Sequence, residues 1–198
     1  LITVRSEGGS PPDVAAFPQP GLAADLVPGL DVFDVADWLG MDYLEEQYSS
    51  AWTDLADIEG IQAGVWYRAS IKSLVWYNMV VFEEEGYEIP ESWDELIALS
   101  DEMVADGYTP WSIGIESSGA TGWVATDWIE DIMLRVHPPE VYDAWVAGDL
   151  GFNSPEFKEA LEYMTQIWFN EDYVLGGREG IVLTPFGDAI TPLAVEPP

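Results

Sequence analysis

The chain alternates between short apolar runs and longer stretches in which apolar residues recur with helical spacing. The clearest helix follows Ser92, because apolar residues repeat at three- and four-residue intervals from Leu96 to Met103 and Gly107 provides a stop. Ser92 and Glu95 form a capping-box pattern, in which each side chain can bond to the backbone amide of the other. This pattern predicts a helix that begins directly after Ser92.

Further elements follow the same reading of apolar and polar positions. Helical spacing predicts helices over residues 22–30, 35–39, 41–53, 78–86, 123–135, 140–147 and 154–168. Runs rich in Val, Ile and aromatic residues predict strands over 1–4, 13–17, 65–70, 74–77, 111–115 and 181–183. Strands that alternate with helices in this way predict an α/β fold.

One stretch, Gly107–Arg135, combines a short strand, a polar glycine-containing turn and a helix. Thr121 is the expected N-cap of that helix, which carries Trp123, Asp127 and Trp128. Free amides, a carboxylate and flat indole rings suit a sugar, which has an apolar face and a rim of hydroxyls. The alternative is that both tryptophans belong to the core.

The two tryptophans are separated by five residues, which is about 140° around a helix. One of them should therefore face outward and the other inward. We expect Trp123, in the first turn, to stack on a ligand, and Trp128, which shares a face with Ile132, to be the more structural of the two. Asp127 lies one turn beyond Trp123 on the same face and can reach a hydroxyl of a stacked sugar.

Two other places are candidates for ligand contact. The turn after Phe17, which contains Gln19, follows a predicted strand, and ligands of open α/β sheets bind at the carboxyl ends of strands. Arg68 and Lys72 are two of the chain's six basic residues and lie near predicted strand ends. A plain connecting turn and simple charge balance with nearby acids are the alternatives.

The net charge of the chain restricts its expected ligands and partners. The 198 residues include 37 acidic and 6 basic side chains, giving a net charge of -31, while 48% hydrophobic residues indicate a packed protein. Such a field repels nucleic acid and anionic membrane surfaces, so neither is an expected partner. A neutral or cationic ligand fits better. This acidity also suits a salty or extracytoplasmic setting.

The sequence lacks the residues and motifs that several kinds of functional site require. The chain has no cysteine and a single histidine, His137, which precedes two prolines at an expected helix end. No phosphate loop, dinucleotide fingerprint or EF-hand spacing occurs, and no apolar run reaches the length of a membrane span. The sequence therefore predicts no catalytic residue, no cofactor and no metal site. The apolar start and proline-rich end look like cuts through a longer protein.

Four motifs in order resemble a known family. They are PPDVAAFPQPGLAADL, GVWYRASIKSLVWYN, GYEIPESWDELIALSDEM and TPWSIGIESSGATGWVATDWIED, which together reach across most of the chain. They resemble the extracellular solute-binding proteins of sugar ABC transporters and are most similar to the α-glucoside-binding branch.

The resemblance implies a periplasmic-binding-protein type II fold with two lobes and a ligand held between them. Residues 1–77 would form part of the first lobe and 78–190 the second, with a hinge near 74–78 and a crossover tail at 191–198. Because family members are about twice as long, the first strand and helix and the C-terminal half are expected to be absent. By position, the ligand-binding residues would be Phe17, Gln19, Trp66, Arg68 and Lys72 from the first lobe, and Trp123, Asp127 and Trp128 from the second.

The function that the resemblance implies is a non-enzymatic sugar receptor that passes its ligand to membrane permease subunits. It would act as a monomer in the periplasm or as a lipoprotein anchored at the cell surface. A glycoside hydrolase is one alternative, although its two carboxylates must face each other, and Asp127 and Asp131 are neighbours on one helix. An acidic cation-binding module is the other, with Asp127, Glu130 and Asp131 as its candidate ligands or as a plain solvated face.

Overall fold

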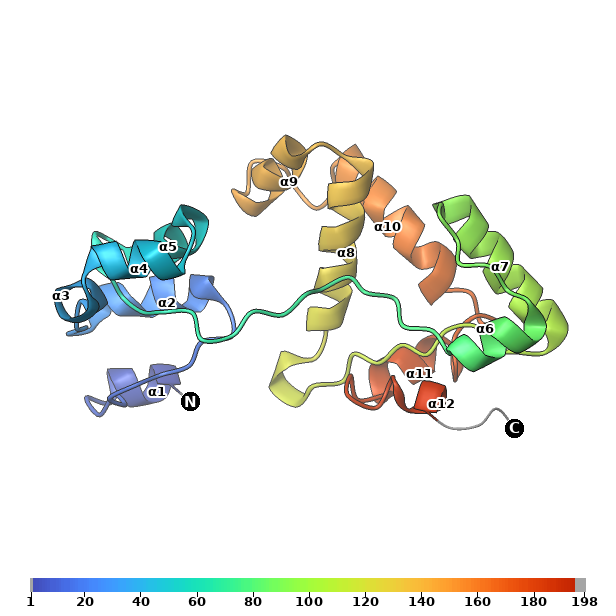
Figure 1. Ribbon diagram of the computed structural model, residues 1–198, viewed down its shortest axis with the longest axis horizontal. Helices are drawn as coiled ribbons and strands as arrows, with labels where there is room; N and C mark the ends of the chain where they lie inside the picture. Colours follow the sequence, from blue (N-terminus) through green and yellow to red (C-terminus); the bar gives the residue numbers. More distant parts are fainter. Residues whose placement is uncertain (1, 195–198) are drawn as a thin grey trace. The chain divides into compact units, whose positions relative to one another are not determined.

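The computed structural model describes residues 2–194, and the chain divides into two compact units, unit 1 (Leu1–Ser70) and unit 2 (Ile71–Pro198). Figure 1 labels the helices of both. Among the described residues, no helix combines the length and apolar character needed to cross a membrane.

Unit 1 consists of short helices and one hairpin. Its elements are α1 (Ile2–Glu7), α2 (Pro20–Leu26), η1 (Val27–Gly29), α3 (Val35–Leu39), α4 (Met41–Gln47), α5 (Ser50–Ala56), β1 (Asp57–Ile58) and β2 (Ile61–Gln62). The Asp34 side chain starts α3 by accepting a hydrogen bond from the Ala36 amide at 2.9 Å. Gly40, at φ 84°, lets the chain turn directly into α4.

The hairpin of unit 1 is antiparallel and pairs Asp57 with Gln62 and Ile58 with Ile61. Its two turn residues, Glu59 and Gly60, both have positive φ, as a tight two-residue hairpin requires. The Asp57 carboxylate supports the turn by accepting from the Gly60 amide at 2.9 Å. The hairpin contributes Ile58 to the buried apolar residues of unit 1, which also include Val27 and Leu44.

Unit 2 is built around two adjacent helices. Its elements are α6 (Met79–Glu85), α7 (Trp93–Asp106), η2 (Ser118–Ala120), α8 (Trp123–Val136), α9 (Pro139–Val146), α10 (Pro155–Trp168), α11 (Gly177–Leu183) and α12 (Thr191–Ala194). Helices α8 and α10 pack against each other, as Figure 1 shows. The core joins their apolar faces to an extended segment and to α11; its buried members include Ile113, Ile115, Ile129, Ile132, Met133, Ala160, Met164, Ile167, Trp168 and Ile181.

In unit 2, α7 and α10 begin where the sequence predicts, and α7 also ends there. The capping box at α7 is confirmed: the Glu95 amide donates to Ser92 Oγ at 3.3 Å, and the Ser92 amide donates to Glu95 Oε2 at 3.1 Å. Ser154 caps α10 by accepting from the Phe157 amide at 3.2 Å, with Pro155 in the first turn. Gly107 ends α7 in a left-handed conformation, as predicted.

The N-cap prediction for α8 is wrong. Gly122, at φ 106°, occupies that position and has no side chain to cap the helix. The Thr121 hydroxyl is engaged one turn earlier: it donates to the Ser118 carbonyl at 2.8 Å and accepts from the Ser117 amide at 2.9 Å. Thr121 therefore stabilises the polar turn rather than the first turn of the helix.

The predicted strands of the α/β fold are mostly absent from the described residues, whose only sheet is the β1–β2 hairpin. Residues 2–4 lie in α1, Leu1 lies outside the described residues, and residues 13–17, 65–70 and 74–77 have no strand partner. Residues 181–183 belong to α11. The physical reason is that β-propensity reflects packing against neighbouring strands, and the apolar runs here have no such neighbour.

The predicted strand at 111–115 is an extended segment with two isolated parallel bridges, Trp111 to Val174 and Glu116 to Pro185. At the second bridge, the Glu116 amide donates to the Thr184 carbonyl at 3.0 Å. Gly114 is required between the bridges, because a Cβ there would lie 2.8 Å from the carbonyl oxygens of Thr184 and Pro185. Among the described residues, the parallel strand pairing expected of an α/β fold is thus found only at these two bridges.

Candidate functional site

The start of α8 presents an indole and a carboxylate on one face. Gly122 allows the sharp turn into the helix, so Trp123 lies in the first turn and Asp127 one turn later. The preceding loop is held by Glu116, whose Oε1 accepts from the Ser118 amide at 2.7 Å. Trp123 and Asp127 are both half-buried, which leaves part of each accessible to a ligand.

Lys72 joins this pair from the extended segment at the start of unit 2. Its Nζ lies 2.7 Å from Asp127 Oδ2 and 4.3 Å from the centroid of the Trp123 ring. The Lys72 side chain is 53% exposed and that of Asp127 26%. The ammonium therefore makes an ion pair and a cation–π contact at the same time. We call Lys72, Trp123 and Asp127 the α8 cluster.

A second carboxylate, Glu130, lies beside the α8 cluster. Burial, and then repulsion by Asp127, raise the pKa of Glu130, while Lys72 acts in the opposite direction. Asp131, the next acid along α8, is paired with Arg135 at 2.8 Å. The acids of α8 are thus largely engaged with cations of the protein, and no three His, Cys, Asp or Glu side chains in residues 2–194 are placed to hold a metal ion.

Phe186 extends the aromatic surface next to the cluster. Its ring lies 5.2 Å from that of Trp123, at an interplanar angle of 71°, and the residue is 50% exposed. The sequence interpretation missed Phe186, which follows the bridge between Glu116 and Pro185. An aromatic residue in the polar turn after a short apolar run is the signal that could have pointed to it.

Trp128 lies on the core side of α8, as expected from its angular separation from Trp123. Its ring centroid is 5.9 Å from that of Trp111 and 5.6 Å from that of Trp168, both in edge-to-face geometry. Trp128 thus packs against the core, whereas Trp123 contacts Lys72 and Phe186, although both indoles are half-buried. Ligand binding by either residue stays a prediction.

In unit 1, Trp66 is the most firmly held of the predicted ligand residues. Its Nε1 donates to the Trp52 carbonyl at 2.6 Å, and its own carbonyl accepts from the Tyr48 hydroxyl at 2.7 Å. The rings of Trp52 and Trp66 meet edge to face at 4.9 Å. Two exposed aromatic residues, Trp52 and Tyr67, thus flank the position, with Tyr67 78% exposed.

The remaining predicted residues of unit 1 are less constrained. Phe17 is half-buried in the irregular segment before α2. Gln19 is exposed at the N-cap of α2, where its side chain makes no capping hydrogen bond. Arg68 is exposed on the extended segment that ends unit 1. None of these three contacts another predicted ligand residue through a hydrogen bond within the described part of the chain.

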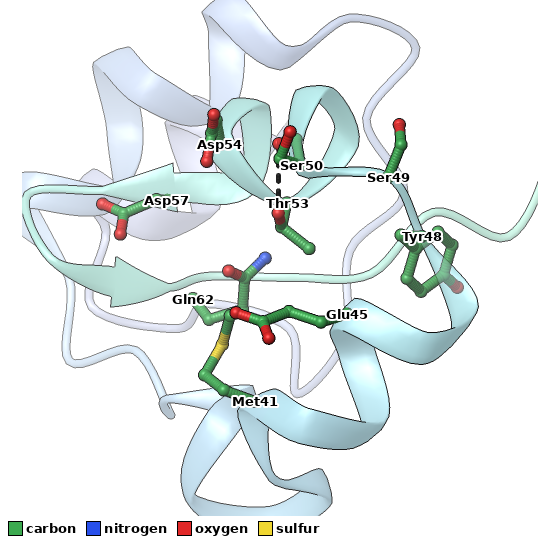
Figure 2. A pocket seen from close by; sticks show the side chains of 9 residues that line it. All are labelled: Met41, Glu45, Tyr48, Ser49, Ser50, Thr53, Asp54, Asp57 and Gln62. Carbon is green, nitrogen blue, oxygen red and sulfur yellow. Dashed lines mark hydrogen bonds between the residues drawn. The ribbon is translucent and has the colours of Figure 1, made fainter.

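A polar cavity in unit 1 was not predicted from the sequence. It has a volume of about 320 Å³, and its lining consists of Met41, Glu45, Tyr48, Ser49, Ser50, Thr53, Asp54, Asp57 and Gln62. Figure 2 shows Glu45 and Gln62 projecting into it from α4 and β2. Tyr48 both lines the cavity and bonds to Trp66. Its lining residues come from separate elements, and in the sequence their polar side chains have the pattern of a solvent-exposed face. No local sequence pattern therefore predicts the cavity.

Comparison with known proteins assigns the chain to a family. The sequence model of the bacterial extracellular solute-binding protein family matches residues 2–174. The chain belongs to this family. The membership predicted from the four motifs is confirmed, and it supports the predicted type II fold; the division into two lobes at residue 77 stays a prediction.

Relatives in the solute-binding protein family cover the whole chain. It is 47% identical to the osmoprotective compounds-binding protein GgtB of Synechocystis sp. and covers 47% of that protein. It is 40% identical to the alpha-glucosides-binding periplasmic protein AglE of Rhizobium meliloti and covers 44% of it. The chain therefore spans about half the length of these curated relatives.

Proposed function

We propose that this chain is part of the carbohydrate-binding receptor of an ABC importer. It acts outside the cytoplasm, binds a neutral sugar of the α-glucoside class and delivers it to the permease subunits. The names of the two relatives support this proposal, since one binds α-glucosides and the other osmoprotective compounds. The net charge of -31 supports a neutral ligand over an anionic one.

The observation that carries the proposal is the arrangement of Trp123 and Asp127. A half-buried indole offers a flat apolar surface, and a carboxylate one turn away accepts hydrogen bonds from hydroxyl groups. A pyranose ring satisfies both, since its C–H face stacks on the ring while a hydroxyl donates to the carboxylate. Phe186 enlarges the apolar surface at a distance of 5.2 Å from Trp123.

A binding role fits these carboxylates better than glycoside hydrolysis. Asp127 is paired with Lys72 and Asp131 with Arg135. Hydrolysis needs one carboxylate kept protonated and a second facing it across the scissile bond. Glu130 has a raised pKa, but it shares one helix with both aspartates, and carboxylates on one helix do not face each other across a scissile bond. We therefore assign no catalytic residue.

A melting experiment on the full-length gene product tests the proposal. We expect maltose, trehalose or sucrose to raise the melting temperature, because a ligand present at about a hundred times its Kd stabilises the folded state by about 2.7 kcal/mol. Galacturonate, an anionic sugar, is the control and should have no effect. Absence of any shift with all three neutral sugars contradicts the proposal, and release of glucose on incubation points to an enzyme.

The predicted residues of unit 1 are tested in the same experiment. Alanine substitutions at Phe17, Gln19, Trp66 and Arg68 should each weaken the sugar response if these side chains contact the ligand. For Trp66, stability must be measured alongside, because the substitution also removes the indole hydrogen bond to the Trp52 carbonyl and the contact between the two rings. Unchanged affinity in all four variants removes unit 1 from the predicted site.

A further inference from the structure

Lys72 occupies the ring surface that a sugar needs. Its ammonium lies 4.3 Å from the centroid of Trp123, well within the range of a cation–π contact. A stacked pyranose places its carbon atoms about 3.5–4.0 Å from the ring atoms. The ammonium and a sugar therefore cannot share this face of the indole.

We propose that Lys72 is a displaceable cover of the sugar site, and that ionic strength tunes sugar affinity by weakening this cover. The inference rests on the proposed function. In the sugar-free state, Lys72 holds the Trp123 face and the Asp127 carboxylate together. A sugar replaces both contacts at once, because its C–H face takes the ring and a hydroxyl takes Asp127 Oδ2.

The cover is weak enough to be displaced. Its ion pair is partly exposed to solvent on both sides, with 53% of the Lys72 side chain and 26% of the Asp127 side chain accessible. Exposed ion pairs and exposed cation–π contacts are each weak interactions. Their combined loss reduces sugar affinity by between about threefold and thirtyfold. That is sufficient to modulate affinity and too little to block the site.

Salt acts selectively on the cover. Raising the ionic strength from about 0.1 M to about 1 M shortens the screening length from about 10 Å to about 3 Å, which weakens a half-exposed ion pair. A neutral sugar carries no charge, so its own contacts are screened much less. Sugar affinity should therefore rise with salt, by a few fold at most.

Isothermal titration of the full-length gene product with maltose and trehalose tests the proposal at about 0.1 M and about 1 M NaCl. We expect wild-type affinity to rise with salt by up to a few fold. Lys72→Met keeps an unbranched side chain that is one atom shorter and removes its charge, so the variant should bind sugar several times more tightly than wild type at low salt and lose the salt response. Lys158→Met changes the chain's other lysine, which is exposed on α10, and should behave as wild type.

Two results overturn the cover and leave the receptor intact. Weaker binding by Lys72→Met at low salt means that Lys72 contacts the sugar directly. A salt response of wild-type size in Lys72→Met means that screening acts elsewhere. If wild type binds no neutral sugar at either salt concentration, the proposed function fails, and the cover fails with it. Circular dichroism and melting curves establish that each variant is folded.

Discussion

Tyr173 donates its phenolic hydrogen to Asp101 Oδ1 over 2.5 Å and thereby joins the segment after α10 to α7. The residue is 3% exposed, and its neighbour Val174 forms the bridge to Trp111. Burial, followed by the hydrogen bond to Asp101, raises the pKa of Tyr173 to about 12. Ionisation of Tyr173 would therefore break a hydrogen bond that joins two segments of the unit 2 core.

The raised pKa of Tyr173 makes unit 2 sensitive to alkali. The folded state favours the protonated phenol, so its contribution is complete below pH 10 and is lost as the pH rises from 10 to about 12. Tyr173→Phe should lower the free energy of unfolding at pH 7 by about 0.5–1.5 kcal/mol and make its decline above pH 10 less steep.

Denaturant titrations at pH 7 and pH 11 measure both effects of Tyr173→Phe. Tyr163→Phe is the matched control, since that hydroxyl makes no hydrogen bond among the described residues. Tyr87 bonds to Asp106 in the same way, so wild type and variant both retain some decline, and the difference between them is the informative quantity. Parallel pH profiles contradict the assignment.

Ser92→Ala removes one half of the capping box of α7. The loss should destabilise the protein by about 0.5–2 kcal/mol, as is usual for an N-cap serine. Urea unfolding followed by circular dichroism measures the change. Thr109→Ala is the control, because that exposed side chain makes no hydrogen bond among the described residues. Equal stability of Ser92→Ala and wild type shows that α7 does not depend on this cap.

Trp123→Ala and Trp128→Ala should separate binding from folding. Trp123→Ala should weaken sugar binding by roughly threefold to tenfold or more, by loss of ring stacking, and cost little stability. Trp128→Ala leaves a void beside Trp111 and Trp168 and should cost about 3 kcal/mol of stability. Calorimetric titration and thermal melting on both variants check this. Normal sugar binding by Trp123→Ala rules out the stacking role.

Calcium should not bind to the acids of α8. Asp127 and Asp131 are each paired with a cation of the protein, so a calcium ion must break two ion pairs to use both. Calorimetric titration with calcium chloride should give no heat of binding at micromolar concentrations. Binding in that range favours the cation-binding alternative over a spread of surface charge.

Local capping chemistry made several helices predictable from the sequence. Ser92 with Glu95, and Ser154 with Pro155, are signals confined to a few neighbouring residues, and α7 and α10 begin where these signals place them. The predicted helix at 41–53 contains two, because the backbone becomes extended at Tyr48 and Ser49. Propensity alone does not reveal such a break.

Strands were less predictable because a strand depends on a partner elsewhere in the chain. The apolar run Ile181–Leu183 has the composition of a strand, yet it completes α11 and buries Ile181 in the core. For the candidate site, helical geometry correctly placed Trp123 and Asp127 on one face. The contact of Lys72 with both residues spans a long separation in sequence, and no local pattern predicts it.

The bridges at Trp111 and Glu116 can form only after the residues that follow α10 have been synthesised and brought back to the extended segment. Each joins backbone groups separated by on the order of sixty residues, so the loop between them must close before either bridge forms. During synthesis, Ile113 and Ile115 leave the ribosome long before Ile181, the residue that helps to cover them. Until α11 emerges these side chains lack part of their cover, and the net charge of -31 opposes association between such incomplete chains.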